Sequence, residues 1–309
     1  MKYDIITIGG AVVDAFVRTN ILKKKGLLSY PVGEKILVKD TDFSSGGGAT
    51  NTAVSFSKLG LKTGCISKIG RDNNGKIILE DLKKNKVTFL GTKSKDETGF
   101  SVILIGKENS RTILQDKGAS ENLSFRELDK EKLKTRWFYI SSSKGKTLNT
   151  QKKLVKYTKK NNIKIAFNPS SYLTKKGPRK IKSILKNTEI LILNKEEATD
   201  LVKTDLFNRL HNLGPKIVCI TDGKKGTKVS GQNSIYEVKA RKIKVKERTG
   251  AGDAFASGFV AGIIKTNNIE KAIKIGTANA ESVIRIKGAK GGLLTWSKAL
   301  KEIKKIKVI

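Results

Sequence analysis

The sequence has few of the residues that build metal clusters, disulfides and hydrolytic triads. Its two cysteines, Cys65 and Cys219, lie far apart within apolar runs, and His211 is the single histidine. Without a Cys-x-x-Cys pair or several histidines, the sequence argues against a zinc site and against a Ser-His-Asp triad. Isolated cysteines are typical of a reducing compartment, so we expect a cytoplasmic protein.

Long apolar runs and acidic residues are also scarce. No run of about 18 apolar residues is present, and the N-terminal segment lacks a signal-peptide core, so we expect no membrane association. The 309 residues include 63 Lys and Arg against 28 Asp and Glu, a net charge of +35. The lysines are spread along the chain rather than gathered in a tail, which favours a solvated surface over a specific nucleic-acid site. A non-catalytic polyanion-binding protein is the alternative from another class.

The stretch that dominates the sequence begins with Gly250-Ala251-Gly252-Asp253 and continues as small and aromatic residues. This pattern predicts a tight turn that opens a buried helix, whose free N–H groups and dipole attract anions. Asp253 would repel a phosphate at rest. It could instead act as a base that takes a proton from an attacking hydroxyl while the N–H groups stabilise a phosphoryl group in transit. The alternative is that Asp253 only caps the helix.

Two N-terminal features favour a site for a polyhydroxylated ligand. Asp14 follows the first predicted strand, at the edge where open α/β sheets bind ligands. Gly46-Gly47-Gly48 precede a helical pattern in which Asn51 offers a donor and an acceptor to a hydroxyl. Each has a simpler alternative: Asp14 could form a turn, and Asn51 could cap a helix behind a flexible loop.

Two later motifs follow predicted strand ends. Asn194 and Glu197 are spaced to share one helix face, where an amide and a carboxylate could hold a hydrated Mg²⁺. They could equally form a capping box. The turn at 221–226 could approach a nucleotide or could be an ordinary hairpin. The glycine loop at 288–292 is expected beside the nucleotide.

The order of the elements predicts a doubly wound α/β fold with a mostly parallel sheet flanked by helices. Strands are expected at 5–8, 137–140, 163–167, 190–193 and 217–220, and helices at 148–160, 180–186 and 270–286. Strands at 36–38, 100–105 and 112–114, the last two joined by a hairpin turn at 106–110, predict a small antiparallel lid that excludes water. We expect one domain over 1–309, with lid strands inserted at about 15–40 and 98–116.

Together, four motifs resemble those of the ribokinase (pfkB) family of carbohydrate and nucleoside kinases. In chain order they are Gly46-Gly47-Gly48-Ala49-Thr50-Asn51, Gly70-Arg71-Asp72-Asn73-Asn74-Gly75, Asn194-Lys195-Glu196-Glu197 and Thr249-Gly250-Ala251-Gly252-Asp253. The last is the most specific. The resemblance implies a ribokinase-like fold and an ATP- and Mg²⁺-dependent kinase that phosphorylates a hydroxyl of a small sugar. A nucleoside kinase of the same family is the alternative.

The resemblance also implies residue roles. Asp253 is the expected catalytic base, and the N–H groups of Gly250, Ala251 and Gly252 form the anion hole. The acceptor is expected at Asp14, Gly46, Gly47, Asn51 and Arg111; ATP at Asn194, Thr221, Gly223, Gly226 and Asn279; and Mg²⁺ at Asn194 and Glu197, largely through water. Potassium-activated members usually carry Asp-Thr-Thr before the glycines. Here Glu247-Arg248-Thr249 stands there, so potassium activation is not implied. Exposed lid strands could also pair two subunits.

Overall fold

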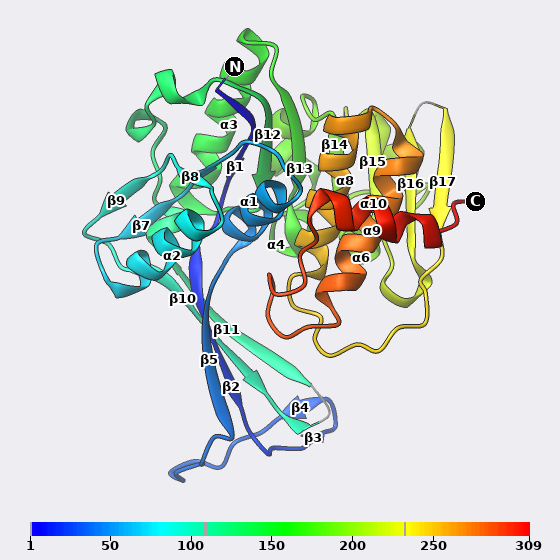
Figure 1. Ribbon diagram of the computed structural model, residues 1–309. Coiled ribbons are helices and arrows are strands. Elements are labelled where there is room, and N and C mark those ends of the chain that lie inside the picture. Colours follow the sequence, from blue (N-terminus) through cyan, green and yellow to red (C-terminus); the bar gives the residue numbers. More distant parts are fainter. Residues whose placement is uncertain (1, 108–109, 232) are drawn as a thin grey trace.

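The fold is built on a nine-stranded sheet in the computed structural model, which describes residues 2–107, 110–231 and 233–309 (Figure 1). The strand order is β17-β16-β15-β14-β13-β12-β1-β6-β8, and neighbouring strands pair in parallel except that β16 is antiparallel to both β15 and β17. Their bounds are β1 (Tyr3–Ile8), β6 (Thr63–Ile66), β8 (Thr88–Phe89), β12 (Thr135–Ser141), β13 (Lys164–Asn168), β14 (Ile190–Asn194), β15 (Ile217–Thr221), β16 (Thr227–Gly231) and β17 (Ser234–Val238).

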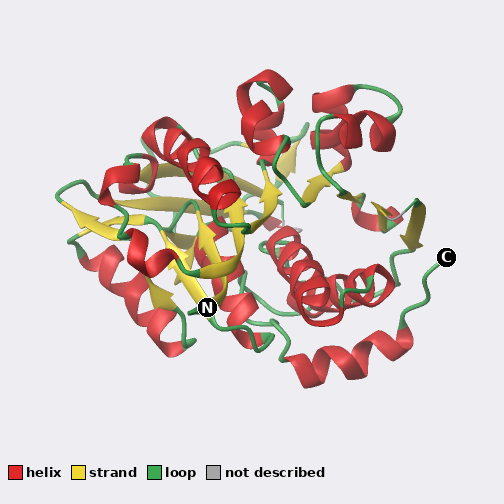
Figure 2. Cartoon of the chain, turned by 90° about the horizontal axis from the view of Figure 1, so that it is seen from above, coloured by secondary structure: helices red, strands yellow, loops and turns green. Residues whose placement is uncertain are grey.

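Helices cover both faces of this sheet (Figure 2). Adjacent residues of one strand therefore enter different apolar clusters: Ile5 packs with the helices of one face and Ile6 with those of the other. Burial on both faces explains why the strands read as continuous apolar runs. One face carries α1 (Gly48–Lys58), α8 (Ala251–Thr266), α9 (Ile269–Val283) and α10 (Trp296–Glu302). The other carries α3 (Gly145–Lys160), α4 (Ser170–Thr174), α5 (Lys182–Leu185), α6 (Lys195–Val202) and α7 (Leu206–Asn212).

A second, four-stranded sheet projects from the end of the large one (Figure 1). It consists of β11 (Arg111–Gly118), β10 (Thr98–Ile105), β2 (Val12–Arg18) and β5 (Asp40–Gly46), in that order. β10 and β2 are parallel, whereas the two outer pairs are antiparallel. The predicted α/β fold with a small lid sheet is thus confirmed, with one parallel pair in place of a wholly antiparallel lid.

Short elements complete the chain. They are β3 (Lys23–Lys24) paired with β4 (Leu27–Leu28), β7 (Lys68–Gly70) paired with β9 (Thr92–Ser94), and α2 (Asn73–Lys84). Helix α2 packs its buried Ile78 and Leu82 in a cluster with α1 and β2. No helix among the described residues is long and apolar enough to cross a bilayer.

Two predicted elements differ from the structure. The strand predicted at 36–38 is wrong: the chain is irregular there, and β5 begins only at Asp40. Leu37 is 91% exposed and Val38 is also exposed, so most of the apolar surface that suggested a strand has no covering layer. The helix predicted at 180–186 is a 3₁₀ turn (Pro178–Ile181) followed by the single turn of α5. Of the predicted hairpin turn at 106–110, residues 108–109 lie outside the described part of the chain.

Candidate active site

Helix α8 begins in a backbone shape that only glycine adopts easily. Gly250 is its N-cap with φ +77°, and a Cβ there would lie 2.6 Å from the carbonyl oxygen of Ala289. Among the described residues no side chain caps this helix, so the alternative that Asp253 only caps it is wrong. The loop that contains Ala289 closes one side of the turn. On the other side a Cβ at Gly252 would meet nothing within 4 Å.

The N–H groups at this helix start are partly free. Ala251 donates its N–H to the carbonyl oxygen of Arg248 at 3.3 Å, so it closes the turn. Within the described residues, the N–H groups of Gly250 and Gly252 have no acceptor at hydrogen-bond distance. Two of the three predicted donors are therefore available to an anion, in the direction the helix dipole favours.

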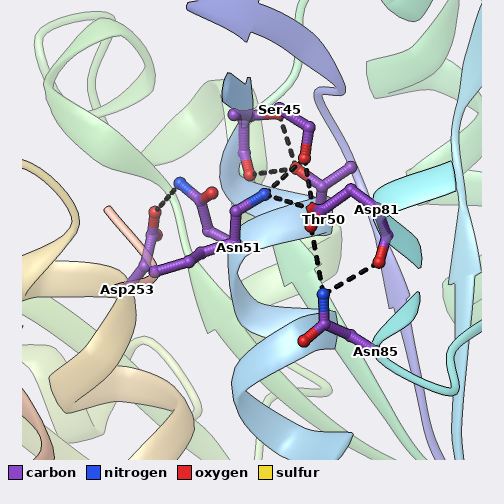
Figure 3. Close-up of polar contacts among 9 residues, drawn as sticks. Ser45, Thr50, Asn51, Asp81, Asn85 and Asp253 are labelled. Atoms are coloured by element: carbon purple, nitrogen blue, oxygen red, sulfur yellow. Dashed lines mark hydrogen bonds and ion pairs between the residues drawn. The ribbon is translucent and has the colours of Figure 1, made fainter. Parts of the chain in front are cut away.

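Asn51 connects α1 to this helix start. Its Nδ2 donates to Oδ2 of Asp253 at 2.9 Å, across 202 positions of sequence (Figure 3). Asn51 Oδ1 is buried and has no hydrogen-bond partner among the described residues. Gly47, not Asn51, is the N-cap of α1, so the alternative cap role of Asn51 is wrong. The amide therefore orients the carboxylate and leaves one acceptor for a further donor such as a hydroxyl.

The surroundings of Asp253 make its carboxyl group a weaker acid than a carboxyl group in water. Burial raises the pKa of Asp253 to about 6. The hydrogen bond from Asn51 lowers this pKa, the negative charge of Asp14 raises it, and the positive charge of Lys290 lowers it. A carboxyl group with a pKa near 6 can accept a proton from a hydroxyl more readily than one with a pKa near 4. The geometry and the pKa together give Asp253 the properties of a general base.

The first glycine motif brings β2, β5 and α1 into contact. A Cβ at Gly46 would lie 1.9 Å from Asp14 Oδ2, and Gly47, with φ +97°, would place a Cβ 2.4 Å from the Gly10 carbonyl oxygen. Asp14 is 8% exposed. Burial raises its pKa, although hydrogen bonding to Ser101 and the charge of Lys290 act in the opposite direction. A larger residue at position 46 would displace Asp14, so Gly46 leaves the space that this carboxyl group occupies.

Lys290 is a site residue that the sequence did not reveal. It comes from the glycine loop at 288–292, and its Nζ lies 2.5 Å from Asp81 Oδ2 on α2 and donates to Ser45 Oγ on β5. Ser45 also donates to Asp81 Oδ2 at 2.5 Å (Figure 3). Burial lowers the pKa of Lys290, which Asp81 opposes. This loop therefore lies against β5 and α2, and its lysine is close enough to act on the charge of Asp253. The one feature of the sequence that could have pointed to Lys290 is its position as a lysine within a glycine-rich loop.

Where β14 ends and α6 begins, Asn194 and Glu197 form the capping box that the sequence allowed. Asn194 Oδ1 accepts from the Glu197 N–H at 2.8 Å, and Glu197 Oε2 accepts from the Asn194 N–H at 2.9 Å. Burial raises the pKa of Glu197, which its backbone hydrogen bonds oppose. No cluster of three acidic, His or Cys side chains suited to a metal occurs in the described chain. These two residues fit a Mg²⁺ that is bound mainly by water and phosphate.

The neighbouring strand brings the predicted hairpin to the same edge. Thr221 is the register partner of Asn194 at the ends of β15 and β14. Gly223, with φ +48°, has open space where a Cβ would point. Gly226 packs on the Val238 carbonyl oxygen and lines a cavity of about 360 Å³. The hairpin is thus confirmed. The space at Gly223 leaves room for a ligand, whereas Gly226 makes room for the neighbouring backbone.

Asn279 lies elsewhere than predicted. It is fully buried in α9, where Nδ2 donates to Ser55 Oγ and the Ala254 carbonyl oxygen, and Oδ1 accepts from the Leu294 N–H at 3.0 Å. An amide with these three bonds and no exposed surface has no group free for ATP. This placement corrects the prediction that Asn279 lies along the nucleotide. Asn279 instead joins α9 to α8 through hydrogen bonds in the core.

Arg111 connects the lid to the catalytic loop. It lies at the start of β11, and Nη1 donates to the hydroxyl of Thr249, next to Gly250. Thr249 directly precedes the glycine turn at Gly250. A movement of the lid would therefore shift this turn through the Arg111–Thr249 hydrogen bond. The structure therefore brings Asp14, Asn51, Arg111 and Asp253 to one end of the molecule, beside the free N–H groups.

Comparison with known proteins gives this site a family. The sequence profile of the pfkB family of carbohydrate kinases matches residues 9–296. This chain belongs to the pfkB family of carbohydrate kinases. The expected activity, ATP-dependent phosphorylation of a sugar, is thereby confirmed at the level of the family.

Individual relatives agree with this family. A protein of Archaeoglobus fulgidus named only as a sugar kinase is 30% identical over 77% of this chain and 97% of its own. A nucleoside kinase of Methanocaldococcus jannaschii is 29% identical over 85% of this chain and 86% of its own. An E. coli protein solved with ATP and Mg²⁺ has the same fold, with a TM-score of 0.83 at 20% identity over 98% of this chain and 99% of that one.

Proposed function

We propose that Asp253 is the general base of a phosphoryl transfer from ATP to a hydroxyl group of a small sugar. The observation that carries this proposal is the Asn51–Asp253 contact beside the free N–H groups of Gly250 and Gly252. Asp253 takes the proton of the acceptor hydroxyl, whose oxygen forms a bond to the γ-phosphorus as the bond to the β-phosphate oxygen breaks. The helix start stabilises the negative charge on the transferred group.

In this proposal the acceptor lies between α1, β2 and the lid. Asp14 accepts a hydrogen bond from one sugar hydroxyl, and Asn51 Oδ1 accepts another, which satisfies its buried oxygen. Gly46 and Gly47 let the sugar approach the backbone, and Arg111 closes the site from the lid. The lid sheet and the large sheet act together as one kinase domain over 1–309, and the lid excludes water from the reacting phosphate.

ATP is proposed to lie along the edge formed by Asn194, Thr221, Gly223 and Gly226. Support comes from the open space at Gly223 and from the E. coli protein of the same fold that binds ATP and Mg²⁺. Mg²⁺ neutralises charge on the nucleotide phosphates when it is bound. Glu197, held by the capping box, orients its water ligands with Asn194.

We propose that transfer does not require potassium. Glu247 Oε2 accepts from the Gly288 N–H at 3.1 Å, and in the described chain Oε1 is its one oxygen without a partner. Arg248 follows directly and brings a fixed positive charge, which disfavours a second cation nearby. Equal kcat in potassium and choline chloride is expected. A tenfold or larger decrease in choline would show that a cation binds at Glu247.

A panel of acceptors tests the function. ATP consumption is measured with ribose, ketodeoxygluconate, fructose, adenosine and cytidine, each with and without Mg²⁺. We expect Mg²⁺-dependent turnover of a sugar. Turnover of adenosine or cytidine alone would support the nucleoside kinase alternative, which the M. jannaschii relative favours. The absence of any acceptor, together with salt-resistant nucleic-acid binding, would support the non-catalytic alternative.

The predicted lid-mediated homodimer stays a prediction. Strands β5 and β11 are the two edges of the lid sheet, and Phe43 and Leu114 on them are exposed. Unpaired edges with apolar side chains favour strand pairing between subunits. Light scattering of the intact protein and of Leu114→Lys tests it: the dimer fraction should fall in the variant if the lid forms the interface.

A further inference from the structure

The charge on one face of the lid sheet changes from negative to positive along the strands. Near the large sheet, Asp14 on β2 lies in register with Ser101 on β10. Four residues further along, Arg18 and Arg111 flank Ile105 in a single row across three strands. Residues four apart on a strand share a face of the sheet. The side chains of Asp14 and Arg18 therefore lie on the same face of β2, separated by about 13 Å of strand. We call Arg18 and Arg111 the arginine row.

The arginine row borders a cavity of about 860 Å³ between the lid and the segment that leads into the catalytic turn. The lid contributes Arg18, Lys23 and Arg111 to its lining. The opposite wall contributes Lys244, Lys246, Arg248 and Lys287. Glu247 is the one acidic residue of the described lining, so seven positive charges face one negative charge.

The lysine-rich composition does not explain this cluster. The chain has ten arginines in 309 residues, and three of them line this single cavity. A general lysine bias would supply lysines and not arginines. Because the guanidinium group binds phosphate and carboxylate with two parallel hydrogen bonds, the residue choice itself points to an oxyanion.

Most of these charges are not neutralised by the protein. Arg18 lies 3.4 Å from Asp40 and 3.9 Å from Asp42, and Lys287 lies 3.8 Å from Asp40. These are long pairs with an exposed partner and contribute little. In the described chain, Lys23, Lys244 and Arg248 have no carboxylate within 4 Å, although the cavity holds them near one another. Such mutual repulsion is relieved when an anion binds among them.

We infer that this cavity is a subsite for an anionic group on the acceptor, so that the preferred substrate is a sugar carrying a phosphate or carboxylate. The inference rests on the proposed function, because it places the reacting hydroxyl at Asp253. The cavity reaches the catalytic turn through Arg248, and the lid that lines it also carries Asp14. Asn194, Thr221, Gly223 and Gly226, the proposed ATP residues, are not among its described lining residues.

Matched acceptor pairs test this inference in the intact protein. The value of kcat/KM is compared for ribose and ribose 5-phosphate, fructose and fructose 1-phosphate, and arabinose and arabinonate. We expect at least one anionic member to be preferred by about tenfold or more. The preference should shrink as KCl rises from about 0.05 M to about 0.5 M, because salt screens the attraction. Equal or better turnover of every neutral member would overturn the inference and leave the kinase function intact.

Charge-removing variants locate the effect. Arg18→Gln should lower the anionic-over-neutral ratio of kcat/KM by about tenfold or more. Arg126→Gln, an exposed arginine of the 3₁₀ turn Phe125–Glu127 outside the cavity, is the matched control and should leave the ratio unchanged. If Arg18→Gln instead raises KM for ATP and keeps the ratio, the cations serve the nucleotide and the inference is wrong.

A separate measurement covers the case in which no acceptor is turned over, which would contradict the kinase function itself. Calorimetric binding of ribose 5-phosphate without ATP then tests the cavity alone. Binding that weakens in Arg18→Gln but not in Arg126→Gln supports an anion subsite. No binding to the wild-type protein, or binding unaffected by Arg18→Gln, contradicts it.

Discussion

The proposed acceptor side and the proposed nucleotide side of the site are built in different ways. Around Asp253, polar groups come from distant parts of the chain: Asn51 lies 202 positions away, and Lys290 meets Asp81 across 209. On the nucleotide side, Asn194 and Glu197 satisfy each other within one helical turn. The first arrangement places charged groups in contact before any ligand arrives. The second is a local cap that offers a nucleotide mainly backbone and open space.

This difference implies that acceptor-side substitutions should cost more than nucleotide-side ones. Long-range contacts among buried charged groups are costly to break, because the remaining partner stays buried and unsatisfied. A capping box can be replaced in part by water or by a neighbouring group. The following substitutions test the contrast, from the largest expected effect to the smallest.

Asp253→Asn should lower kcat by about 10²–10⁴-fold, because an amide cannot accept the hydroxyl proton. The substitution keeps size and a hydrogen-bonding partner for Asn51, so ATP affinity should be retained. Steady-state kinetics and calorimetry measure the two quantities. Asp129→Asn, at an exposed 3₁₀ turn, is the control. A variant with more than a tenth of wild-type turnover would refute the role of base.

Asn51→Ala should lower kcat/KM by about 10–100-fold. It removes a hydrogen bond to a charged group and the free Oδ1 proposed for the acceptor. The pKa of Asp253 should also rise, since the Asn51 hydrogen bond lowers it. Asn161→Ala, which removes a local bond at the end of α3, should have no effect on kinetics. Equal kinetics for the two variants would show that Asn51 has no role in catalysis or acceptor binding.

Lys290→Met should shift the acidic limb of the kcat/KM profile to higher pH. The ammonium lowers the pKa of both Asp253 and Asp14, so its removal raises both. The loss should be about tenfold on the acidic side of the limb and smaller well above it. Asp81→Asn, which removes only the partner of Lys290, separates charge from packing. An unshifted limb with a lowered plateau would indicate a purely structural role.

Glu197→Gln should have the smallest effect, a decrease in kcat of up to about tenfold. Glutamine can still close the capping box, so the fold is preserved while the charge near the proposed Mg²⁺ is lost. The Mg²⁺ concentration needed for half-maximal activity should rise. A loss as large as that of Asp253→Asn would mean that the two sides of the site do not differ as described.

The motifs at 46–51 and 250–253 could be found in the sequence because each is a short run of adjacent residues, although the contact between them is long-range. A glycine turn followed by an aspartate, and a glycine run followed by an asparagine, can each be recognised from a few adjacent residues. The pairing of Lys290 with Asp81 could not be predicted, because it depends on how the loop at 288–292 meets α2. Asn279 was misplaced for the same reason: its helix was predicted, but not which face of it lies under α8.

The fold was predictable where burial is two-sided. The five predicted strands of the large sheet, now β1, β12, β13, β14 and β15, have apolar runs at their centres and lie within one or two residues of their predicted positions. The other four strands of this sheet were not predicted. The segment at 36–38 has the same composition but no covering layer, and Leu37 remains exposed. Hydrophobicity alone therefore could not separate a buried strand from an exposed apolar loop beside the lid.

The most direct test of the account is the pH dependence of kcat/KM in the wild-type protein with its best acceptor. Burial holds the pKa of Asp253 at about 6, and the base works only when ionised. Activity should therefore fall as pH decreases through about 6, with a slope of one proton. A limb near pH 4, or a flat profile between pH 5 and 7, would contradict the claim that a buried Asp253 accepts the proton.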